Sequence, residues 1–221
     1  MKAVLLLAAV LVAPTASARP VLVEMFVSQS CSSCPPANAL LQSLAATDKG
    51  ILPLSLDVTY WNYLSWHDTD SSDAATARQY WYAKLSGSDV YTPEAVVDGG
   101  AQLVGSDRGA LTQAIMAARA APAANVPIGI WGGATLRVTV GAGTGAAQVI
   151  LFGYDDRHDT HVAAGENGGA VISEINVVRE FAPIGAWHGK AAVFTVTRPA
   201  GQHVAVLLQA ESGAVLGLSA L

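Results

Sequence analysis

Two cysteines separated by two serines place the strongest constraint on how this chain folds. They form the segment Cys31-Ser-Ser-Cys34, and the 221-residue chain has no other cysteine. An apolar run, Val21–Val27, precedes the pair, and residues 35–46 follow it with leucines at helical spacing. A Cys-x-x-Cys pair at a strand-to-helix junction is typical of redox dithiols, because N–H groups at a helix N-terminus stabilise a thiolate. The spacing therefore predicts a redox-active pair.

The expected roles of the two thiols follow from their order. Cys31 is farther from the helix body, so we expect it to be the more exposed, attacking thiol and Cys34 to be the resolving one. Pro35 suits the first helical position, which puts Cys34 near the N-cap and weakens the effect of the helix on Cys31. A structural disulfide and a metal site are the alternatives. Chain entropy favours the redox interpretation over a structural bridge, because closing a four-residue loop contributes only about 2 kcal/mol.

Composition and charge exclude two broad classes. The chain is 52% hydrophobic and only 13% charged, which excludes intrinsic disorder. The count of 12 Lys+Arg against 17 Asp+Glu gives a net charge of -5, so we expect no nucleic-acid partner.

The N-terminus has the pattern of a secretory signal peptide. Lys2 precedes an uncharged run of about 11 residues, and Ala16-Ser17-Ala18 supplies the small residues of a cleavage site. The run is too short to span a bilayer, which takes roughly 20 residues. We therefore expect cleavage after Ala18 and a mature protein, exported to the periplasm or secreted, with no membrane span.

The mature chain divides by pattern into an α/β half, residues 19–122, and an all-β half, residues 123–221. The first half alternates strand and helix signals, and Pro53 suggests an edge position or a late start for the second strand. Its expected elements are strands at 21–27, 51–58, 95–97 and 102–105 and helices at 35–46, 74–85 and 108–120. The second half has short alternating runs between glycines, as in a β-sandwich. Its expected strands are 128–131, 136–140, 149–154, 171–178, 192–196 and 204–208.

The first half resembles a thioredoxin fold, because the dithiol follows the first strand and Tyr91-Thr92-Pro93 precedes a later one. More specifically, the chain resembles the secreted, thioredoxin-like family known as domain of unknown function 1223 (DUF1223). The segments that carry this resemblance are Glu24-Met-Phe-Val-Ser-Gln-Ser-Cys31-Ser-Ser-Cys34-Pro-Pro, Tyr60-Trp61, Thr76-Ala77-Arg78-Gln79, Tyr91-Thr92-Pro93, Val97-Asp98-Gly99, Val104-Gly105-Ser106, Gly165-Glu166-Asn167 and Asn176-Val177-Val178-Arg179.

The resemblance implies a fold and several site residues. It implies that Pro93 is a cis-proline facing the cysteines and that Glu24, an acid in an apolar strand, is a proton carrier for the resolving thiol; an ion-paired Glu24 is the alternative. The chain departs from the family at Asp57-Val-Thr-Tyr-Trp-Asn62, where relatives tend to begin with histidine. An imidazole that could hold a metal or carry a proton is therefore missing.

Two other clusters are candidate sites. Tyr60, Trp61 and Trp66 lie in the densest aromatic segment, which lines a substrate groove with Thr92 or else packs under a loop. The polar run from Asp155 to His161 contains His-x-x-His, but we interpret it as a solvated turn and expect no metal there. Glu166 and Arg179 are expected to pair across strands.

Three functions remain open. The leading one is an exported thiol-disulfide oxidoreductase that needs no cofactor and acts on a protein or small thiol/disulfide substrate. The alternatives are a non-enzymatic binding module with a structural disulfide and a copper- or zinc-handling protein that uses the two thiolates with a histidine such as His67.

Overall fold

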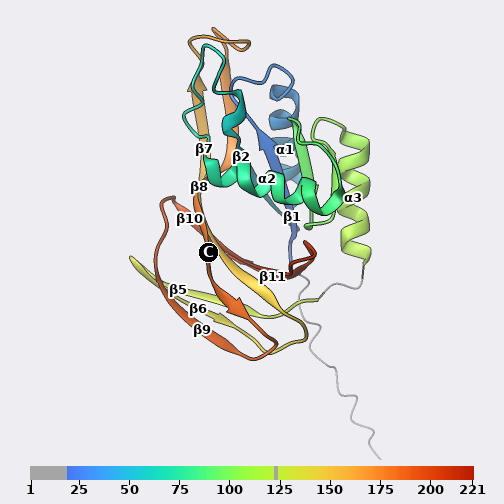
Figure 1. The fold of residues 1–221 in the computed structure, drawn as a ribbon, viewed down its shortest axis with the longest axis vertical. Helices are drawn as coiled ribbons and strands as arrows, with labels where there is room; N and C mark the ends of the chain where they lie inside the picture. The colour runs from blue at the N-terminus through green and yellow to red at the C-terminus, as the bar shows by residue number, and fades with distance from the viewer. Residues whose placement is uncertain (1–18, 122–123) are drawn as a thin grey trace, which may run out of the picture.

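A computed structural model describes residues 19–121 and 124–221 (Figure 1). The predicted signal peptide, residues 1–18, lies outside the described residues. Within them the chain forms three α-helices, one 3-10 turn and eleven strands. In chain order the elements are β1 (Val21–Val27), α1 (Pro35–Thr47), β2 (Ile51–Asp57), η1 (Thr59–Trp61), α2 (Asp73–Ser86), β3 (Glu94–Val97), β4 (Ala101–Val104), α3 (Arg108–Ala120), β5 (Ile128–Gly132), β6 (Thr135–Val140), β7 (Ala147–His161), β8 (Val171–Trp187), β9 (Ala192–Thr197), β10 (His203–Gln209) and β11 (Val215–Ala220).

A mixed eight-stranded sheet organises the fold, in the order β11-β10-β7-β8-β2-β1-β3-β4. β1 and β2 run parallel along their whole length, whereas β2 meets β8 in parallel at one residue pair, Ser55 and Val177. The other neighbours are antiparallel. A second sheet has three strands in the order β5-β6-β9. The protein is therefore a mixed α/β structure with one large and one small sheet.

The large sheet crosses the boundary predicted near residue 122, because β7, β8, β10 and β11 extend the sheet formed by β1–β4. The residues after 127 do form two packed layers, in which Val138 of the small sheet shares a core with Val149 and Val206 of the large one. One of these layers is nonetheless continuous with the sheet of the first half. The half predicted as a β-sandwich thus has two layers, and one of them extends the α/β sheet.

Several strand predictions differ from the structure. β7 and β8 continue well beyond 149–154 and 171–178, because the charged residues after Tyr154 lie on exposed parts of a paired strand and not in a turn. β11 was not predicted, since Gly217 interrupts its apolar pattern. Pro53 lies in an internal strand that already starts at Ile51, so the edge position or late start suggested by this proline is wrong. The strand accommodates Pro53 because the pairing of β2 with β8 is confined to Ser55. The Pro53 carbonyl accepts from the side-chain amide of Asn176.

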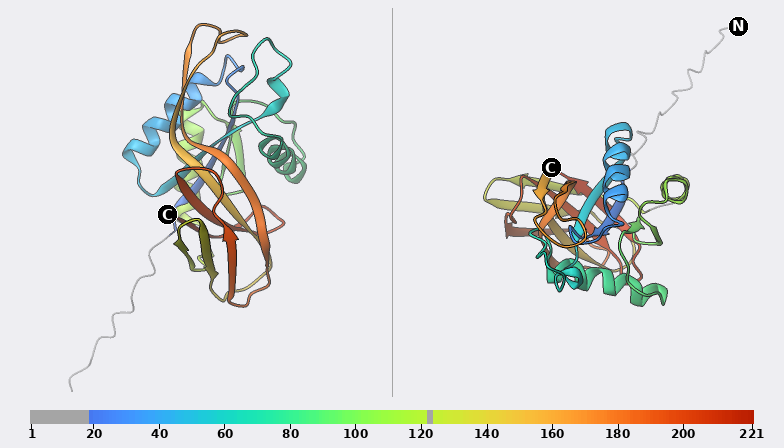
Figure 2. Two further views of the ribbon diagram at one scale, coloured as in Figure 1. Left: turned by 90° about the vertical axis from the view of Figure 1, so that its left-hand side faces the viewer. Right: turned by 90° about the horizontal axis from the view of Figure 1, so that it is seen from above.

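The helices cover both faces of the β1–β3 region. α1 and α3 pack on the face that carries Val23 and Met25, and α2 packs on the face that carries Leu22 and Phe26 (Figure 2). Such two-sided cover explains why all seven residues of β1 are buried. The Oγ of Ser72 caps α2 by accepting from the Ala75 amide at 3.1 Å. No helix in the described part of the chain is long and apolar enough to cross a bilayer.

A buried ion pair joins three elements at the centre of the α2 face. Both Nε and Nη2 of Arg78, in α2, donate to the carboxylate of Glu24, in β1; the Nη2 bond is 2.9 Å. Nη2 also lies 2.9 Å from Oε1 of Gln209, in β10, and the Tyr82 hydroxyl donates to Glu24 at 2.5 Å. The pair is almost fully enclosed, with 6% of the Arg78 side chain and none of the Glu24 side chain exposed. It therefore links the first strand to the second half of the chain.

Removing one partner of this ion pair is expected to be far more damaging than removing both. Arg78→Leu should lower the free energy of unfolding by about 3–5 kcal/mol, because it leaves a buried carboxylate without its counter-charge. Glu24→Leu combined with Arg78→Leu should cost less than Arg78→Leu alone. Urea denaturation of the two variants measures the difference.

Arg157→Leu is the matched control, because Arg157 pairs with Asp159 on the exposed surface. It should leave the denaturation midpoint close to that of the parent protein. A double variant less stable than Arg78→Leu would contradict the account of the buried pair.

Candidate functional site

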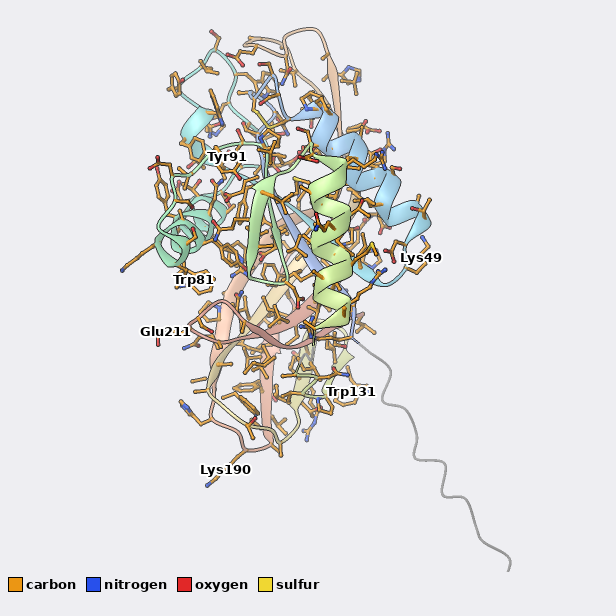
Figure 3. The ribbon with its side chains drawn as sticks, turned by 90° about the vertical axis from the view of Figure 1, so that its right-hand side faces the viewer. Lys49, Trp81, Tyr91, Trp131, Lys190 and Glu211 are labelled. Atoms are coloured by element: carbon orange, nitrogen blue, oxygen red, sulfur yellow. A yellow bond between two sulfur atoms is a disulfide. The ribbon has the colours of Figure 1, made fainter. Side chains whose placement is uncertain are left out.

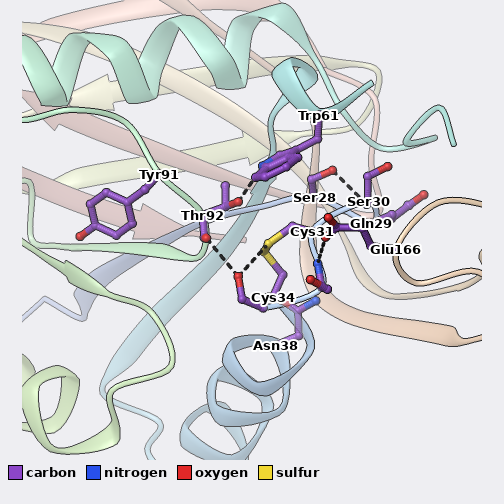
Figure 4. Close-up of a disulfide and its surroundings, with 12 residues drawn as sticks. Ser28, Gln29, Ser30, Cys31, Cys34, Asn38, Trp61, Tyr91, Thr92 and Glu166 are labelled. Carbon is purple, nitrogen blue, oxygen red and sulfur yellow. Dashed lines mark hydrogen bonds between the residues drawn. A yellow bond between two sulfur atoms is a disulfide. The ribbon is translucent and has the colours of Figure 1, made fainter. Parts of the chain in front are cut away.

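The two cysteines form a disulfide at the start of α1 (Figure 4). Their Cα atoms are 5.4 Å apart, and Cys34 is the N-cap residue of the helix. Pro35 and Pro36 occupy the first helical positions and carry no N–H. The next two amides, of Ala37 and Asn38, donate to the carbonyl of Cys34 at 2.9 and 3.1 Å. The first turn therefore offers Cys31 no unused amide, in agreement with the weak helix effect expected from the two prolines.

A short chain of contacts connects the disulfide to the Thr92–Pro93 bond, which is cis. The Sγ of Cys31 lies 3.3 Å from the hydroxyl of Ser33, and that hydroxyl donates to the carbonyl of Thr92 at 3.3 Å. The indole N–H of Trp61 donates to Oγ1 of Thr92 at 2.8 Å. The structure thus brings together Cys31, Cys34, Thr92 and Trp61, in the arrangement drawn in Figure 4.

The other two aromatic candidates have hydrogen-bond partners of their own. The indole N–H of Trp66 donates to Oε1 of Gln29 at 3.0 Å, so it orders the segment just before Cys31. The Tyr60 hydroxyl donates to Gln79 of α2 at 3.1 Å, which points it toward the opposite face of the sheet. Burial raises the pKa of Tyr60 to about 12. Tyr60 therefore packs against α2, and its hydroxyl also interacts with the side chain of Thr92.

Both cysteines are equally covered, with 1% of each residue exposed. The expectation of a more exposed Cys31 is wrong, because the loop of residues 162–170, between β7 and β8, lies over it. The side-chain amide of Asn167 donates to the carbonyls of Gln29 and Cys31 at 2.9 and 3.0 Å. A carboxylate oxygen of Glu166 accepts from the Ser32 amide at 3.2 Å. We call residues 162–170 the cover loop.

The cover loop also corrects a predicted ion pair. Glu166 bonds to Ser32, and hydrogen bonds from that residue lower the pKa of the Glu166 carboxyl. Arg179 instead pairs with Asp70 and Asp155. Glu166 and Arg179 do not meet because β7 and β8 are long. The cover loop at their tip, which carries Glu166, reaches the start of α1, whereas Arg179 lies farther along β8 (Figure 1).

Glu24 lies on the other side of the sheet from the disulfide. In β1, Val23 and Met25 share a core cluster with Cys31 and Cys34, whereas Leu22 and Phe26 belong to the α2 side. Strand alternation puts Glu24 with the second set, where Arg78 and Tyr82 bind it. This placement contradicts a proton-carrier role and supports the ion-paired alternative.

Two other buried carboxyls do lie on the disulfide side. Asp57 ends β2 opposite Val27, which packs with the cysteines. Glu174 of β8 accepts from the side-chain amide of Asn38, one turn after Cys34, at 3.3 Å. Both oxygens of Asp57 and one of Glu174 are buried without a donor among the described residues. A proton held between the two carboxyls would supply the missing donor.

The electrostatics of this acid pair favour the protonated form. Burial, reinforced by the charges of Asp68 and Asp70, raises the pKa of Glu174 to about 8. Burial and the charge of Glu174 raise the pKa of Asp57 well above its ordinary value. One sequence signal could have identified Asp57: it is a carboxylate at the end of a strand parallel to the one before Cys31. No such signal marks Glu174, which lies 140 residues beyond Cys34.

The polar run of β7 is engaged in ion pairs. Asp155 contacts Arg179, Asp156 contacts His203, and His158 lies 2.5 Å from Asp70. Among the described residues no group of three or more His, Cys, Asp or Glu side chains is arranged to hold a metal ion.

The fold and site define a mixed α/β protein with a Cys-x-x-Cys disulfide at a helix N-terminus. The chain belongs to the family described as "Protein of unknown function (DUF1223)", whose sequence profile matches residues 22–209. The resemblance inferred from the sequence motifs is thereby confirmed.

Two solved structures resemble the chain. The crystal structure of protein AGR_C_4864 from Agrobacterium tumefaciens is 30% identical, with a TM-score of 0.79 over 94% of this chain and 96% of that one. HBP35 of Porphyromonas gingivalis is 12% identical, with a TM-score of 0.62 over 92% of this chain and 74% of that one, and shares the fold alone. No curated protein matches the chain.

The acid pair predicts a stability that falls as pH rises. Below the ordinary pKa of 4.5, Glu174 is protonated in the folded and unfolded states alike. Between pH 4.5 and about 8 the unfolded chain releases a proton that the folded protein retains, so the free energy of unfolding decreases. One proton contributes a slope of at most about 1.4 kcal/mol per pH unit.

Glu174→Gln should reduce this slope, because an amide does not titrate and still accepts from Asn38. Urea denaturation between pH 5 and 8 measures it, with the exposed Glu211→Gln as the matched control. An unchanged slope in Glu174→Gln would show that Glu174 ionises normally in the folded protein.

The cover loop predicts slow access to the disulfide. Asn167→Ala removes two hydrogen bonds that hold the loop, so dithiothreitol should reduce the Cys31–Cys34 bond about tenfold faster. Quenched thiol counting gives the rate. Gln113→Ala, at an exposed amide on α3, should leave it unchanged. Equal rates in both variants would mean that the loop does not limit access.

Proposed function

We propose that this protein is an exported thiol-disulfide oxidoreductase with a thioredoxin-like arrangement, acting through Cys31 and Cys34. The observation that carries the proposal is the disulfide at the N-terminus of α1, beside Thr92–Pro93, with the acid pair on the same side of the sheet. The order strand, Cys-x-x-Cys helix, strand, helix, hairpin, helix supports the thioredoxin-like assignment. The signal-peptide pattern of residues 1–18 supports export, to a compartment where disulfides persist.

In the proposed exchange, the substrate attacks the sulfur of Cys31. A substrate thiolate bonds to Sγ of Cys31, the Cys31–Cys34 bond breaks, and Cys34 leaves as a thiolate. A second substrate thiolate then attacks the substrate sulfur of this mixed disulfide and releases Cys31. The substrate loses two electrons as its disulfide forms, and the protein gains them as a dithiol. The reverse sequence reduces a substrate disulfide, and the partner's potential sets the direction.

The acid pair has a place in this exchange. Cys34 needs a proton when it leaves as a thiolate, and Glu174, whose pKa is raised to about 8, lies on the same side of the sheet together with Asp57, whose pKa is also raised by burial. Asn38 connects Glu174 to the first turn of α1, which begins at Cys34. We assign the acid pair this proton-supplying role in place of Glu24.

Thr92, Trp61 and the cover loop define how a substrate reaches the disulfide. Thr92 and Trp61 lie beside the disulfide (Figure 4), and Asn167 holds the cover loop to the backbone carbonyl of Cys31. A protein or small thiol substrate must therefore displace the cover loop before attack. This requirement favours a partner that supplies binding contacts of its own.

A fixed disulfide in a binding module is the second candidate, and the 1% exposure of each cysteine favours it. In that case the disulfide holds the N-terminus of α1 and takes no part in exchange.

Redox titration separates the two candidates. We expect a reduction potential between about -270 and -120 mV, the range of thiol-disulfide catalysts, and turnover with a dithiol or disulfide substrate. A potential below about -300 mV without turnover would favour the fixed disulfide.

Trapping tests the assigned roles of the cysteines. Cys34→Ser should accumulate a mixed disulfide on Cys31, because the resolving thiol is gone. Cys31→Ser with Cys34→Ser is the control and should accumulate none. A partner captured equally by both variants would be bound without disulfide exchange.

A further inference from the structure

The α2 face of the molecule contains a cavity that the proposed redox site does not use. It has a volume of about 800 Å³ and lies between α2, the β7–β8 ribbon and the end of β10. This volume is within the range of small-molecule sites. Trp81 and Glu211, at its border, lie on the same side of the molecule in Figure 3. The disulfide lies on the opposite side of the sheet.

The lining is apolar and unusually small in side-chain volume. Alanines contribute much of it, including Ala74 and Ala77 of α2 and Ala182 of β8. The larger lining side chains, Trp81 and Phe181, are half-buried aromatics. Small residues beside aromatic rings leave an open volume bounded by flat π surfaces, which suits a planar apolar molecule.

A buried cation also lines this volume. The guanidinium of Arg78 lies 5.9 Å from the ring centroids of both Trp81 and Phe181. Its Nε and Nη2 are bound to Glu24, Tyr82 and Gln209, but Nη1 has no hydrogen-bond partner among the described residues. Nη1 is not fully enclosed by protein atoms. Because it has neither a partner nor complete cover, its N–H groups face open volume. The cavity therefore contains a polar donor on a side chain that is more than nine-tenths buried.

The surrounding charges select the kind of acceptor. Glu24 already neutralises Arg78, so a second anion at Nη1 would add a charge that no free cation of the lining compensates. The other ionisable side chains that line the cavity are Glu211, which repels an anion, and His188. A neutral oxygen acceptor can take the Nη1 hydrogen bond without these costs.

We propose that this cavity binds an uncharged, planar aromatic carbonyl compound, with its carbonyl oxygen on Nη1 of Arg78 and its ring against Trp81 and Phe181. The apolar area supplies most of the affinity and the single hydrogen bond fixes the orientation. Binding involves no covalent step and is independent of the disulfide.

Calorimetry with three probes of similar shape tests the ligand class on the full chain. 2-Acetylnaphthalene carries the carbonyl, 2-ethylnaphthalene lacks it, and 2-naphthoate is charged. We expect the ketone to bind, and the hydrocarbon to bind about tenfold more weakly, the loss that follows when one hydrogen bond to a charged donor is not made. The naphthoate should bind more weakly than the ketone.

A pair of alanine substitutions tests the location. Ala182→Phe fills the cavity from an exposed strand position and should remove measurable binding of the ketone. Ala220→Phe places the same side chain at an exposed position of β11, outside the cavity, and should leave the affinity unchanged. Thermal unfolding of both variants confirms that they are folded. Arg78 is kept, because its removal disrupts Glu24.

The outcomes decide the proposal. No binding of the ketone, equal affinity in Ala182→Phe, a hydrocarbon that binds as tightly as the ketone, or a naphthoate that binds more tightly each overturns it. Ketone binding that persists in Cys31→Ser with Cys34→Ser supports it and separates it from the redox site.

Discussion

The bidentate contact between Glu24 and Arg78 is the interaction on which the rest of the structure depends. A carboxylate in a fully buried strand is costly unless a counter-charge meets it, and the matching cation comes from α2. Gln209 of β10 completes the network from the far half of the chain. The pair therefore fixes how α2 and the second half of the sheet are oriented around β1. The same requirement leaves one guanidinium edge free to face the cavity.

The two faces of the β1–β2 region hold their acids in different states. On the α2 side, Glu24 is matched by a cation. On the α1 side, Asp57 and Glu174 have no cation bound among the described residues, and burial raises the pKa of both carboxyls, which favours their neutral form. A charged network stabilises one geometry, whereas a protonated pair can release or accept a proton without a new counter-ion. This contrast is why the α1 side, with its disulfide, is the better place for chemistry that moves protons.

Local chemistry predicted most of the first half. The apolar run of β1, the prolines after Cys34 and the caps Ser72 and Asp107 each act within a few residues, so the corresponding elements were found close to their observed bounds. The site was predicted only in part. Cys31, Cys34 and Thr92, which were singled out from the sequence, lie close together. The face occupied by Glu24, the cover loop and Glu174 were missed, because each depends on contacts between distant segments that leave no local pattern.

The backbone pairing between β2 and β8 is unusually short for two neighbouring strands of this sheet. A single backbone pair, Ser55 and Val177, joins these strands, aided by hydrogen bonds from the side chains of Ser55 and Asn176. Beyond this point the tip of the β7–β8 ribbon continues as a two-stranded arm, anchored to the site mainly through its side chains. The position of this arm beside α1 therefore depends on side-chain contacts more than on backbone pairing with β2. A change in the length of the cover loop would therefore alter what covers the disulfide and leave the parallel pairing of β1 and β2 as it is.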